Sequence, residues 1–295
     1  MLTAEHHEIR SKGVGGSDIA PIMGLSPWKT SHELWLEKTG AVEPEKLDTQ
    51  FVHFGNVLEQ IVADEFATRN DFKVRKQNKT FTHKEYPQLL ANIDRSVDGE
   101  KAILECKTSS AWKMGDWGEE MTEDVPDYYR VQVEHYMNVK GYEIAYLAVL
   151  IGGNTFRTYF FERDPELSEM IQDAAIDFWD MVINNTPPPI NYDHSTTHDM
   201  LLRRYPGTNG ETIHLPTEIQ PWHEVLLQTS AKILELEKVK EGCKNRIQES
   251  MGENAVGIVP SKNFQYKRSL VKRKESTVAA SEYWSQRGSK YDPNK

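Results

Sequence analysis

The chain has 295 residues, with 45 Asp and Glu against 35 Lys and Arg, which gives a formal net charge of −10. This balance disfavours a basic protein that coats DNA through charge alone. The charge is unevenly spread, because residues 260–295 carry nine Lys or Arg and only three acids. The charge therefore neither establishes nor excludes nucleic acid as a ligand.

Length and cysteine content limit the architecture. A chain of this size can bury one large α/β core and still carry an appendage. Cys106 and Cys243 are too few for a disulfide framework or a four-cysteine iron–sulfur cluster. The first residues form no apolar signal segment, and no run is long enough to span a bilayer. We expect a cytoplasmic protein without a membrane partner.

The chain opens with a glycine-rich turn. Residues 10–20 lead through Gly15-Gly16-Ser17-Asp18 into an apolar periodic segment, which predicts a helix with Ser17 or Asp18 as its N-cap. Backbone N–H groups at such a helix start, with Arg10 and Ser17 nearby, make a ready anion site. Taken alone, the motif is more often only a helix cap.

Two further helices are expected over 31–40 and 51–70. The second has an apolar stripe that we expect to be buried, formed by Val57, Leu58, Ile61, Val62 and Phe66. Glu59 lies beside this stripe, where an ordinary boundary glutamate is the simplest interpretation. An exposed strand or strand pair is expected over 72–83.

A β-hairpin with acidic residues at one end is the most informative feature. An apolar run leads into Asp94, Gly99 supplies a turn, and a second apolar run ends in Glu105-Cys106-Lys107. Because side chains alternate along a strand, Glu105 and Lys107 share a face. Converging carboxylates suit a hard divalent cation whose shell is completed by water and phosphate. A lysine beside them can position a water and offset charge on a phosphate under attack.

The same residues also fit a solvated hairpin with a surface ion pair, because Asp, Glu and Lys are common in soluble proteins. Glu105 and Lys107 stand in an otherwise apolar strand, where charges are costly unless they pair or bind a metal. This context favours the layout of the PD-(D/E)xK nucleases over the surface ion pair.

Further regular elements are expected downstream. They are a loop or short helix over 110–123, a helix from Asp127 to Gly141, strands over 144–151 and 155–162 joined by a tight turn, and a helix over 166–184. A stretch rich in proline and polar residues then indicates a boundary. We expect a nuclease-like domain over 1–190 and a C-terminal extension over 191–295.

The extension is expected to contain a helical arm over 216–251. A β-hairpin with a basic strand follows over 255–274, and the last twenty or so residues are expected to be disordered. The helical arm fits packing on its own body or on a partner subunit. The basic stretch mildly favours DNA.

Four motifs in this order resemble the phage λ-exonuclease/YqaJ family of viral recombinases. They are Arg10 with Gly15-Gly16-Ser17-Asp18-Ile19-Ala20, then Gly55-Asn56-Val57-Leu58-Glu59, then Asp94 with Glu105-x-Lys107, and Gln132-Val133-Glu134-His135-Tyr136. The resemblance covers roughly residues 10–185, and the stretch from Ser17 to Gly40 is most similar to the YqaJ branch. It implies an α/β fold with a restriction-endonuclease-like PD-(D/E)xK core, in which helices flank a mixed central sheet.

By this resemblance, Asp94 and Glu105 would be metal ligands, and the main-chain carbonyl of Cys106 would be a further ligand. Glu59 would complete the carboxylate set. The sequence departs from the family pattern at Ile93, where the family has a proline before the metal-binding aspartate. That proline is often lost in the superfamily. The extension beyond residue 190 is a second departure, because the λ enzyme lacks it.

The resemblance also assigns the remaining site residues. Lys107 would orient the attacking water, and Gln132 would lie against that water and Lys107. Arg10 and Ser17 would hold a phosphate, which in the family is the 5′-terminal one.

The function implied is a Mg²⁺-dependent 5′→3′ exonuclease, with Mn²⁺ as a substitute, that degrades one strand of linear double-stranded DNA. It would leave 3′ overhangs for phage-type homologous recombination by single-strand annealing. The implied partners are DNA ends, an annealing protein of the RecT/Redβ type and further copies of the chain, as in a trimeric ring. The implied location is the cytoplasm of a bacterial host.

Two other functions remain open. One is a Mg²⁺-dependent endonuclease built on the same core, and the other is a non-catalytic DNA-binding or scaffold protein. A zinc site is not expected, because the histidines are scattered without His/Cys ligand spacing.

Overall fold

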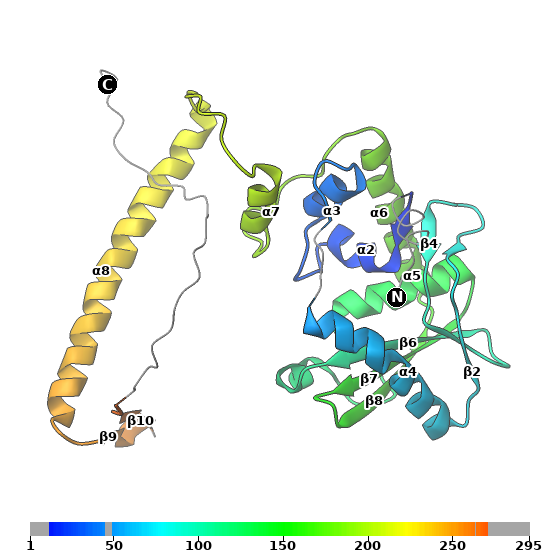
Figure 1. The fold of residues 1–295 in the computed structure, drawn as a ribbon, viewed down its shortest axis with the longest axis horizontal. Helices are drawn as coiled ribbons and strands as arrows, with labels where there is room; N and C mark the ends of the chain where they lie inside the picture. The colour runs from blue at the N-terminus through cyan, green and yellow to red at the C-terminus, as the bar shows by residue number, and fades with distance from the viewer. Residues whose placement is uncertain (1–11, 45–48, 263, 271–295) are drawn as a thin grey trace. The chain divides into compact units, whose positions relative to one another are not determined.

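The computed structural model describes residues 12–44, 49–262 and 264–270. Contacts divide the chain into two units, Met1–Pro206 and Gly207–Lys295 (Figure 1). The first unit is mixed α/β, and it contains the hairpin and the motifs singled out above.

The first unit is built on a five-stranded sheet in the order β2-β5-β6-β7-β8. Its strands are β2 (Val74–Lys76), β5 (Arg95–Val97), β6 (Ala102–Ser109), β7 (Ile144–Ile151) and β8 (Thr155–Glu162). The β6–β7 pair is parallel and the other neighbouring pairs are antiparallel. The predicted hairpin around Gly99, which has φ of 87°, is confirmed, as are the two strands beyond it.

A second, smaller sheet joins the start of the described chain to the segment before the hairpin. Its order is β1-β4-β3, from β1 (Val14–Gly15), β4 (Leu89–Ala91) and β3 (Phe81–Thr82). The β1 strand pairs in parallel with β4, so Val14 lies opposite Leu89. This pairing brings the glycine-rich turn close to the chain that leads into Asp94.

Helices cover both faces of the large sheet (Figure 1). They are α2 (Gly16–Ile22), α3 (Ser31–Lys38), α4 (Gln50–Asn70), α5 (Asp127–Lys140) and α6 (Pro165–Ile183), with a 3₁₀ turn η1 at Ala111–Asp116. Alternate residues of β6 face different helices, since Ile103 packs in the core with α5 and α6, whereas Leu104 packs with α4. The sheet is therefore the middle of three layers, which confirms the predicted fold class.

Two local expectations were wrong. The N-cap of α2 is Gly15 rather than Ser17 or Asp18, because the Asp18 carboxylate reaches back to accept the Gly15 N–H at 2.9 Å. On α4, Val57 and Ile61 are exposed by 51% and 55%. The buried residues of α4 are Val62, Ala63 and Phe66, which lie over β5, β6 and β7, so the sheet covers only the second half of this helix.

The chain beyond residue 190 does not leave the first unit at once. A helix that the sequence did not predict, α7 (Thr197–Arg204), buries Met200 in the main core. Its Arg203 forms an ion pair with Glu33 of α3. By its contacts, the first unit includes α7 and runs to Pro206. The boundary predicted at residue 190 rested on the proline-rich segment before α7.

The second unit contains one long helix and a hairpin. A 3₁₀ turn η2 (Thr217–Ile219) leads into α8 (Gln220–Met251), and β9 (Val256–Val259) pairs antiparallel with β10 (Phe264–Lys267), with a 3₁₀ turn η3 at Pro260–Lys262. The predicted helical arm and hairpin are confirmed. The basic residues 272–274 and the predicted disordered tail lie outside the described residues. None of the described helices is long and apolar enough to cross a membrane.

One buried histidine gives the fold a pH dependence. His135 on α5 has no exposed surface, and its Nε2 lies 3.0 Å from the Leu90 carbonyl oxygen. Burial lowers the pKa of His135 to about 4 from an ordinary value of 6.5. Between pH 4 and 6.5, the unfolded chain therefore binds more protons at His135 than the folded chain does. The free energy of unfolding falls as the pH falls through this range, and His135 contributes on the order of 3 kcal/mol to the loss.

Denaturant unfolding at pH 7.5 and pH 4.5 (about three units apart) measures this loss. We expect a smaller loss in His135→Gln, whose amide can still donate to Leu90 but does not titrate. Equal losses in the two proteins would assign the acid sensitivity to other groups.

Candidate functional site

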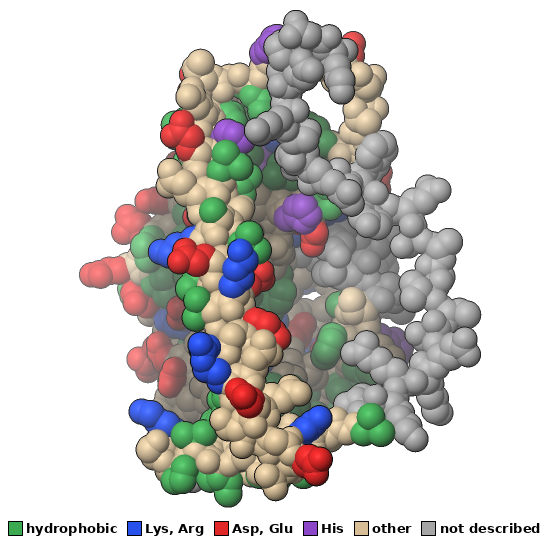
Figure 2. All heavy atoms as spheres, turned by 90° about the vertical axis from the view of Figure 1, so that its left-hand side faces the viewer, with side chains coloured by type: hydrophobic (Ala, Val, Ile, Leu, Met, Phe, Trp, Pro, Cys, Tyr) green, Lys and Arg blue, Asp and Glu red, His purple; other side chains and the backbone are tan. Residues whose placement is uncertain are grey.

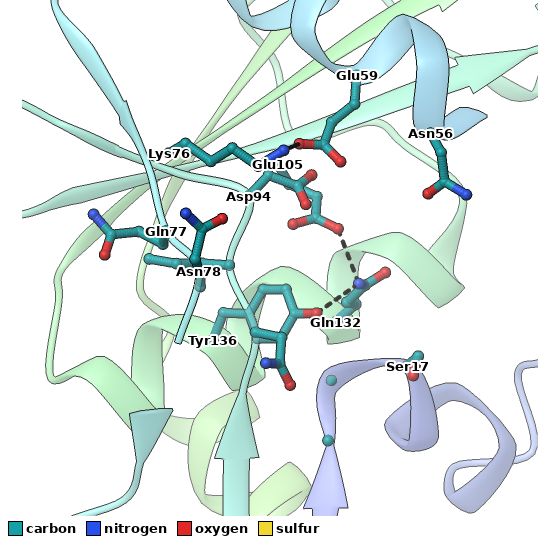
Figure 3. A pocket seen from close by; sticks show the side chains of 14 residues that line it. Ser17, Asn56, Glu59, Lys76, Gln77, Asn78, Asp94, Glu105, Gln132 and Tyr136 are labelled. Carbon is teal, nitrogen blue, oxygen red and sulfur yellow. Dashed lines mark hydrogen bonds and ion pairs between the residues drawn. The ribbon is translucent and has the colours of Figure 1, made fainter. Parts of the chain in front are cut away.

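A cavity of about 270 Å³ brings together residues that are far apart in the sequence (Figure 3). Five of the residues predicted from the sequence line it: Ser17, Glu59, Asp94, Glu105 and Gln132. Two more contact these residues from its edge, Lys107 through its side chain and Cys106 through its main chain. Arg10 lies outside the described residues.

The hairpin register places the two acids together. Arg95, the first residue of β5, pairs with Leu104 of β6. Asp94 immediately precedes this pair and Glu105 immediately follows it, so the two carboxyl groups lie side by side. The backbone N–H of Cys106 donates to Asp94 Oδ2 at 2.9 Å, which fixes the Asp94 side chain against β6.

Side-chain alternation along β6 places Cys106 on one face of the sheet and Glu105 and Lys107 on the other. The Cys106 side chain packs in the core under α4, where burial raises the pKa of its thiol. Glu105 and Lys107 point to the opposite face, as predicted. Lys107 Nζ donates to Glu105 Oε1 at 2.7 Å and to Gln132 Oε1 at 3.2 Å.

The α5 helix supplies a second wall of the site. Gln132 and Tyr136 lie one turn apart, so both face the cavity. Gln132 Nε2 donates to Glu105 Oε1 and to the Tyr136 hydroxyl oxygen, each at 3.0 Å. From the same helix, the Tyr129 ring lies 4.8 Å from Lys107 Nζ. The ammonium group of Lys107 is therefore held by two oxygens and the face of an aromatic ring.

The two carboxyl groups of Asp94 and Glu105 share one cation, Lys107. Burial and the charge of Glu105 raise the pKa of Asp94 to about 8. Glu105 Oε2 is buried and accepts no hydrogen bond. Lys107 offsets part of this charge: burial alone would lower its pKa, but Glu105, Tyr129 and Asp94 outweigh burial and raise it. Two adjacent carboxyl groups with an unsatisfied oxygen are suitable donors for a hard divalent cation.

Glu59 is placed differently from the other two acids. Its Oε1 accepts from Arg95 Nη1 at 2.6 Å and lies 3.4 Å from Lys76 Nζ. Although burial alone would raise the pKa of Glu59, these two cations lower it. In the described parts of the chain, no three His, Cys, Asp or Glu side chains are arranged to hold a metal. Two carboxylates are nevertheless a common donor set for Mg²⁺, which keeps several waters.

The sequence missed several residues of the cavity. Lys76, Gln77 and Asn78 enter it from the end of β2, in a segment predicted only as an exposed strand. Asn56 and Asn92 line it as well. Short polar residues of this kind carry no sequence signal for a site. Tyr136 could have been found, because it lies four residues after Gln132 on a helix.

The fold is similar to that of a solved alkaline exonuclease. The first unit's architecture is similar to an alkaline exonuclease (LHK-Exo) from Laribacter hongkongensis, with a TM-score of 0.51 and 16% identity, covering 62% of this chain and 94% of that one. The same exonuclease in complex with dAMP matches with a TM-score of 0.53 and 17% identity, at the same coverage of 62% and 94%.

The chain belongs to the family of the YqaJ-like viral recombinase domain. That domain matches residues 5–143. The uncharacterized protein YqaJ of Bacillus subtilis (strain 168) is 42% identical over 254 residues, which are 85% of this chain and 78% of that protein. The family confirms the resemblance drawn from the four motifs.

Arg95 joins α4 to the hairpin, and its loss should be costly. Its side chain is 1% exposed and donates to Glu59, to the Asp94 carbonyl oxygen and to Gln60. We expect Arg95→Ala to lower the free energy of unfolding by about 2–4 kcal/mol, since it leaves buried acceptors unpaired. In Arg75→Ala, which removes a surface ion pair with Asp98, the loss should be within about 1 kcal/mol. Denaturant unfolding of both variants measures the contrast, and equal losses would contradict it.

Two adjacent glycines of the motif should differ sharply. A Cβ on Gly16 would lie 2.2 Å from the Tyr136 ring, whereas a Cβ on Gly15 would meet nothing closer than 3.7 Å. Gly16→Ala must displace the ring that Gln132 holds, so we expect a loss of about 1–3 kcal/mol in unfolding free energy. We expect Gly15→Ala to change it by less than about 1 kcal/mol. Thermal and denaturant unfolding of both variants measure these losses. A larger loss in Gly15→Ala than in Gly16→Ala would contradict the prediction.

Proposed function

We propose that this protein is a Mg²⁺-dependent 5′→3′ exonuclease that acts on the ends of linear double-stranded DNA. It leaves 3′ single-stranded overhangs for phage-type recombination by single-strand annealing, and Mn²⁺ can replace Mg²⁺. The observation that carries the proposal is the adjacent pair Asp94 and Glu105, with Lys107 in hydrogen-bond contact with Glu105. Membership of a viral recombinase family supports it.

Asp94 and Glu105, with the main-chain carbonyl of Cys106, are the residues that would hold the metal ion. The buried and unpartnered Glu105 Oε2 supports this assignment. Glu59 lies on the same cavity wall but is paired with Arg95, so it would act as an outer carboxylate. When bound, Mg²⁺ polarises the scissile phosphate and acidifies a bound water.

Lys107, Gln132 and Tyr136 would position the attacking water and the phosphate. Because the pKa of Lys107 is raised, its side chain is a cation at neutral pH and serves as a hydrogen-bond donor rather than as a base. It is suited to orient a water and to offset negative charge on the phosphate. Gln132 holds both Lys107 and Glu105, and Tyr136 in turn anchors Gln132.

The rest of the cavity suits a nucleic-acid backbone. Ser17 and the N-terminus of α2 lie across the cavity from the acids (Figure 3), where a 5′-phosphate held by Ser17 and Arg10 would mark the strand end. Uncharged amides from Asn56, Gln77 and Asn78 line the walls between. Amide contacts to phosphate and sugar position DNA without reading its sequence, which suits an enzyme specific for ends rather than bases.

The proposed partners are DNA ends, further copies of the chain and a single-strand annealing protein of the RecT/Redβ type. Family membership supports these partners, because a recombination nuclease passes its overhang to an annealing protein. The second candidate function is an endonuclease on the same core. It shares the carboxylates and Lys107 but has no need of the phosphate site at Ser17.

Digestion of end-labelled DNA tests the function. Linear duplex with 5′-phosphate or 5′-hydroxyl ends and closed circular duplex are incubated with and without Mg²⁺. We expect Mg²⁺-dependent loss of the 5′-phosphorylated linear strand, with the circle spared. Lys107→Ala should reduce the rate by at least about 100-fold, because it removes a preorganised donor. Lys101→Ala, an exposed lysine in the turn of the same hairpin, is the matched control and should retain full rate.

Other outcomes would replace the proposal. Cutting of the circle would establish the endonuclease. Degradation from 3′ ends would reverse the proposed polarity. Absence of activity on every substrate with Mg²⁺ or Mn²⁺ would leave a DNA-binding or scaffold protein.

A further inference from the structure

The long helix of the second unit exposes an unusual amount of apolar surface. None of the 32 residues of α8 is buried. Leu226, Ile233 and Leu236 are exposed by 63%, 52% and 58%. A helix of this length extends about 48 Å. In water, most helix stability comes from packing of an apolar face rather than from the helix itself. Such a face therefore calls for a partner surface.

Five apolar residues of α8, with Thr229 and Lys240 between them, follow a heptad spacing, whereas Leu227 and Leu234 lie off it. Alternating steps of four and three residues run from Leu226 through Thr229, Ile233, Leu236, Lys240 and Cys243 to Ile247. These positions form one stripe along the helix, and Val225 and Val239 widen it on one flank. A repeat of 3.5 residues keeps a stripe facing a second helix that winds around the first. The pattern is thus typical of pairing with another long helix.

The charges of α8 identify the partner. The helix carries five acidic and five basic residues. Figure 2 shows hydrophobic side chains spaced along it, with charged side chains of both signs between them. A neutral helix offers no surplus of positive charge to DNA. It is also not repelled by its own copy.

A parallel copy in the same register would also be charge-complementary. Lys232 and Glu237 flank the stripe on opposite sides, five residues apart. In a parallel pair, each Lys232 faces the Glu237 of the other helix, which gives the contact twice by symmetry. An antiparallel pair would place Lys232 near Val239 instead. The single charged residue within the stripe, Lys240, disfavours shifted registers at some cost in stability.

We propose that α8 binds the α8 of a second copy of this chain, as a parallel, in-register pair joined along the stripe Leu226–Ile247. The proposal is independent of nuclease activity. It identifies the surface through which the protein self-associates.

The sequence contains its own reporter for this arrangement. Of the two cysteines, Cys106 is buried and Cys243 is exposed. Cys243 lies in the stripe, and a parallel, in-register pair brings two Cys243 thiols together. Oxidised glutathione would accept the two electrons as these thiols form one disulfide. The disulfide-linked dimer is visible on a non-reducing gel.

The test compares two double variants of the full-length protein. Ile233→Asp with Leu236→Asp places charge in the stripe. Leu227→Asp with Leu234→Asp places the same charge on the other side of α8, at residues exposed by 58% and 56%. Each protein is examined by light scattering after size-exclusion chromatography, by crosslinking with oxidised glutathione, and by circular dichroism.

The proposal expects wild type to have at least twice the protomer mass of 33.9 kDa and to form the Cys243 disulfide. The stripe variant should lose both properties while its first unit keeps its melting temperature. The control variant should keep both. Cys243→Ser should keep the mass and lose only the crosslink.

Several results would overturn the proposal. A monomeric wild type at micromolar concentration would do so, as would equal behaviour of the two double variants. A self-associated wild type without a Cys243 crosslink would exclude the parallel register. If the stripe variant kept its mass but lost thermal stability or duplex binding, the stripe would instead pack on the chain's own body or on DNA.

Discussion

The site depends on the antiparallel register between β5 and β6. Arg95 pairs with Leu104. Asp94, which precedes Arg95, and Glu105, which follows Leu104, therefore become neighbours. A shift of one residue would turn Glu105 and Lys107 into the core under α4 and leave Cys106 in the cavity. The bond from the Cys106 N–H to Asp94 then locks the arrangement from the main chain. The arrangement of the acids and Lys107 in the site therefore follows from the register of one strand pair, β5 and β6.

The β5–β6 hairpin also positions cations beside the partly buried acids of the site. On one side of β6, Lys107 is held between Glu105, Gln132 and Tyr129. On the other side of the hairpin, the buried Arg95 holds α4 through Glu59. Each cation satisfies an acid that would otherwise be costly to bury. Asp94 and Glu105, in contrast, share the single cation Lys107, and burial together with Glu105 raises the pKa of Asp94 to about 8. A metal ion bound at this pair would supply the missing positive charge and favour ionised Asp94.

Much of the fold and the centre of the site could be predicted because short-range rules determine them. Period-two alternation predicted the face shared by Glu105 and Lys107, and turn residues predicted the hairpins. Two contacts that the sequence did not predict have a long-range cause. Glu59 lines the cavity, but its pairing with Arg95 depends on how α4 crosses the hairpin. Buried Met200 of α7 depends on a surface built by distant helices. No local pattern encodes either contact.

The overall acidity of the chain is compatible with a DNA substrate if attraction is local. A net charge of −10 repels a duplex at long range, but salt screens such repulsion beyond roughly 10 Å. Lys76 lines the cavity and Lys107 contacts Glu105 at its edge. The other lining residues include neutral amides and the acids Glu59, Asp94 and Glu105. The surplus of basic residues in the sequence lies after residue 260, and α8 is neutral. An acidic protein with few cations at the candidate site would bind duplex DNA weakly along the length of the duplex. Tight contact would then be restricted to a strand end that can enter the cavity, and this restriction supports the proposed exonuclease over the alternative endonuclease.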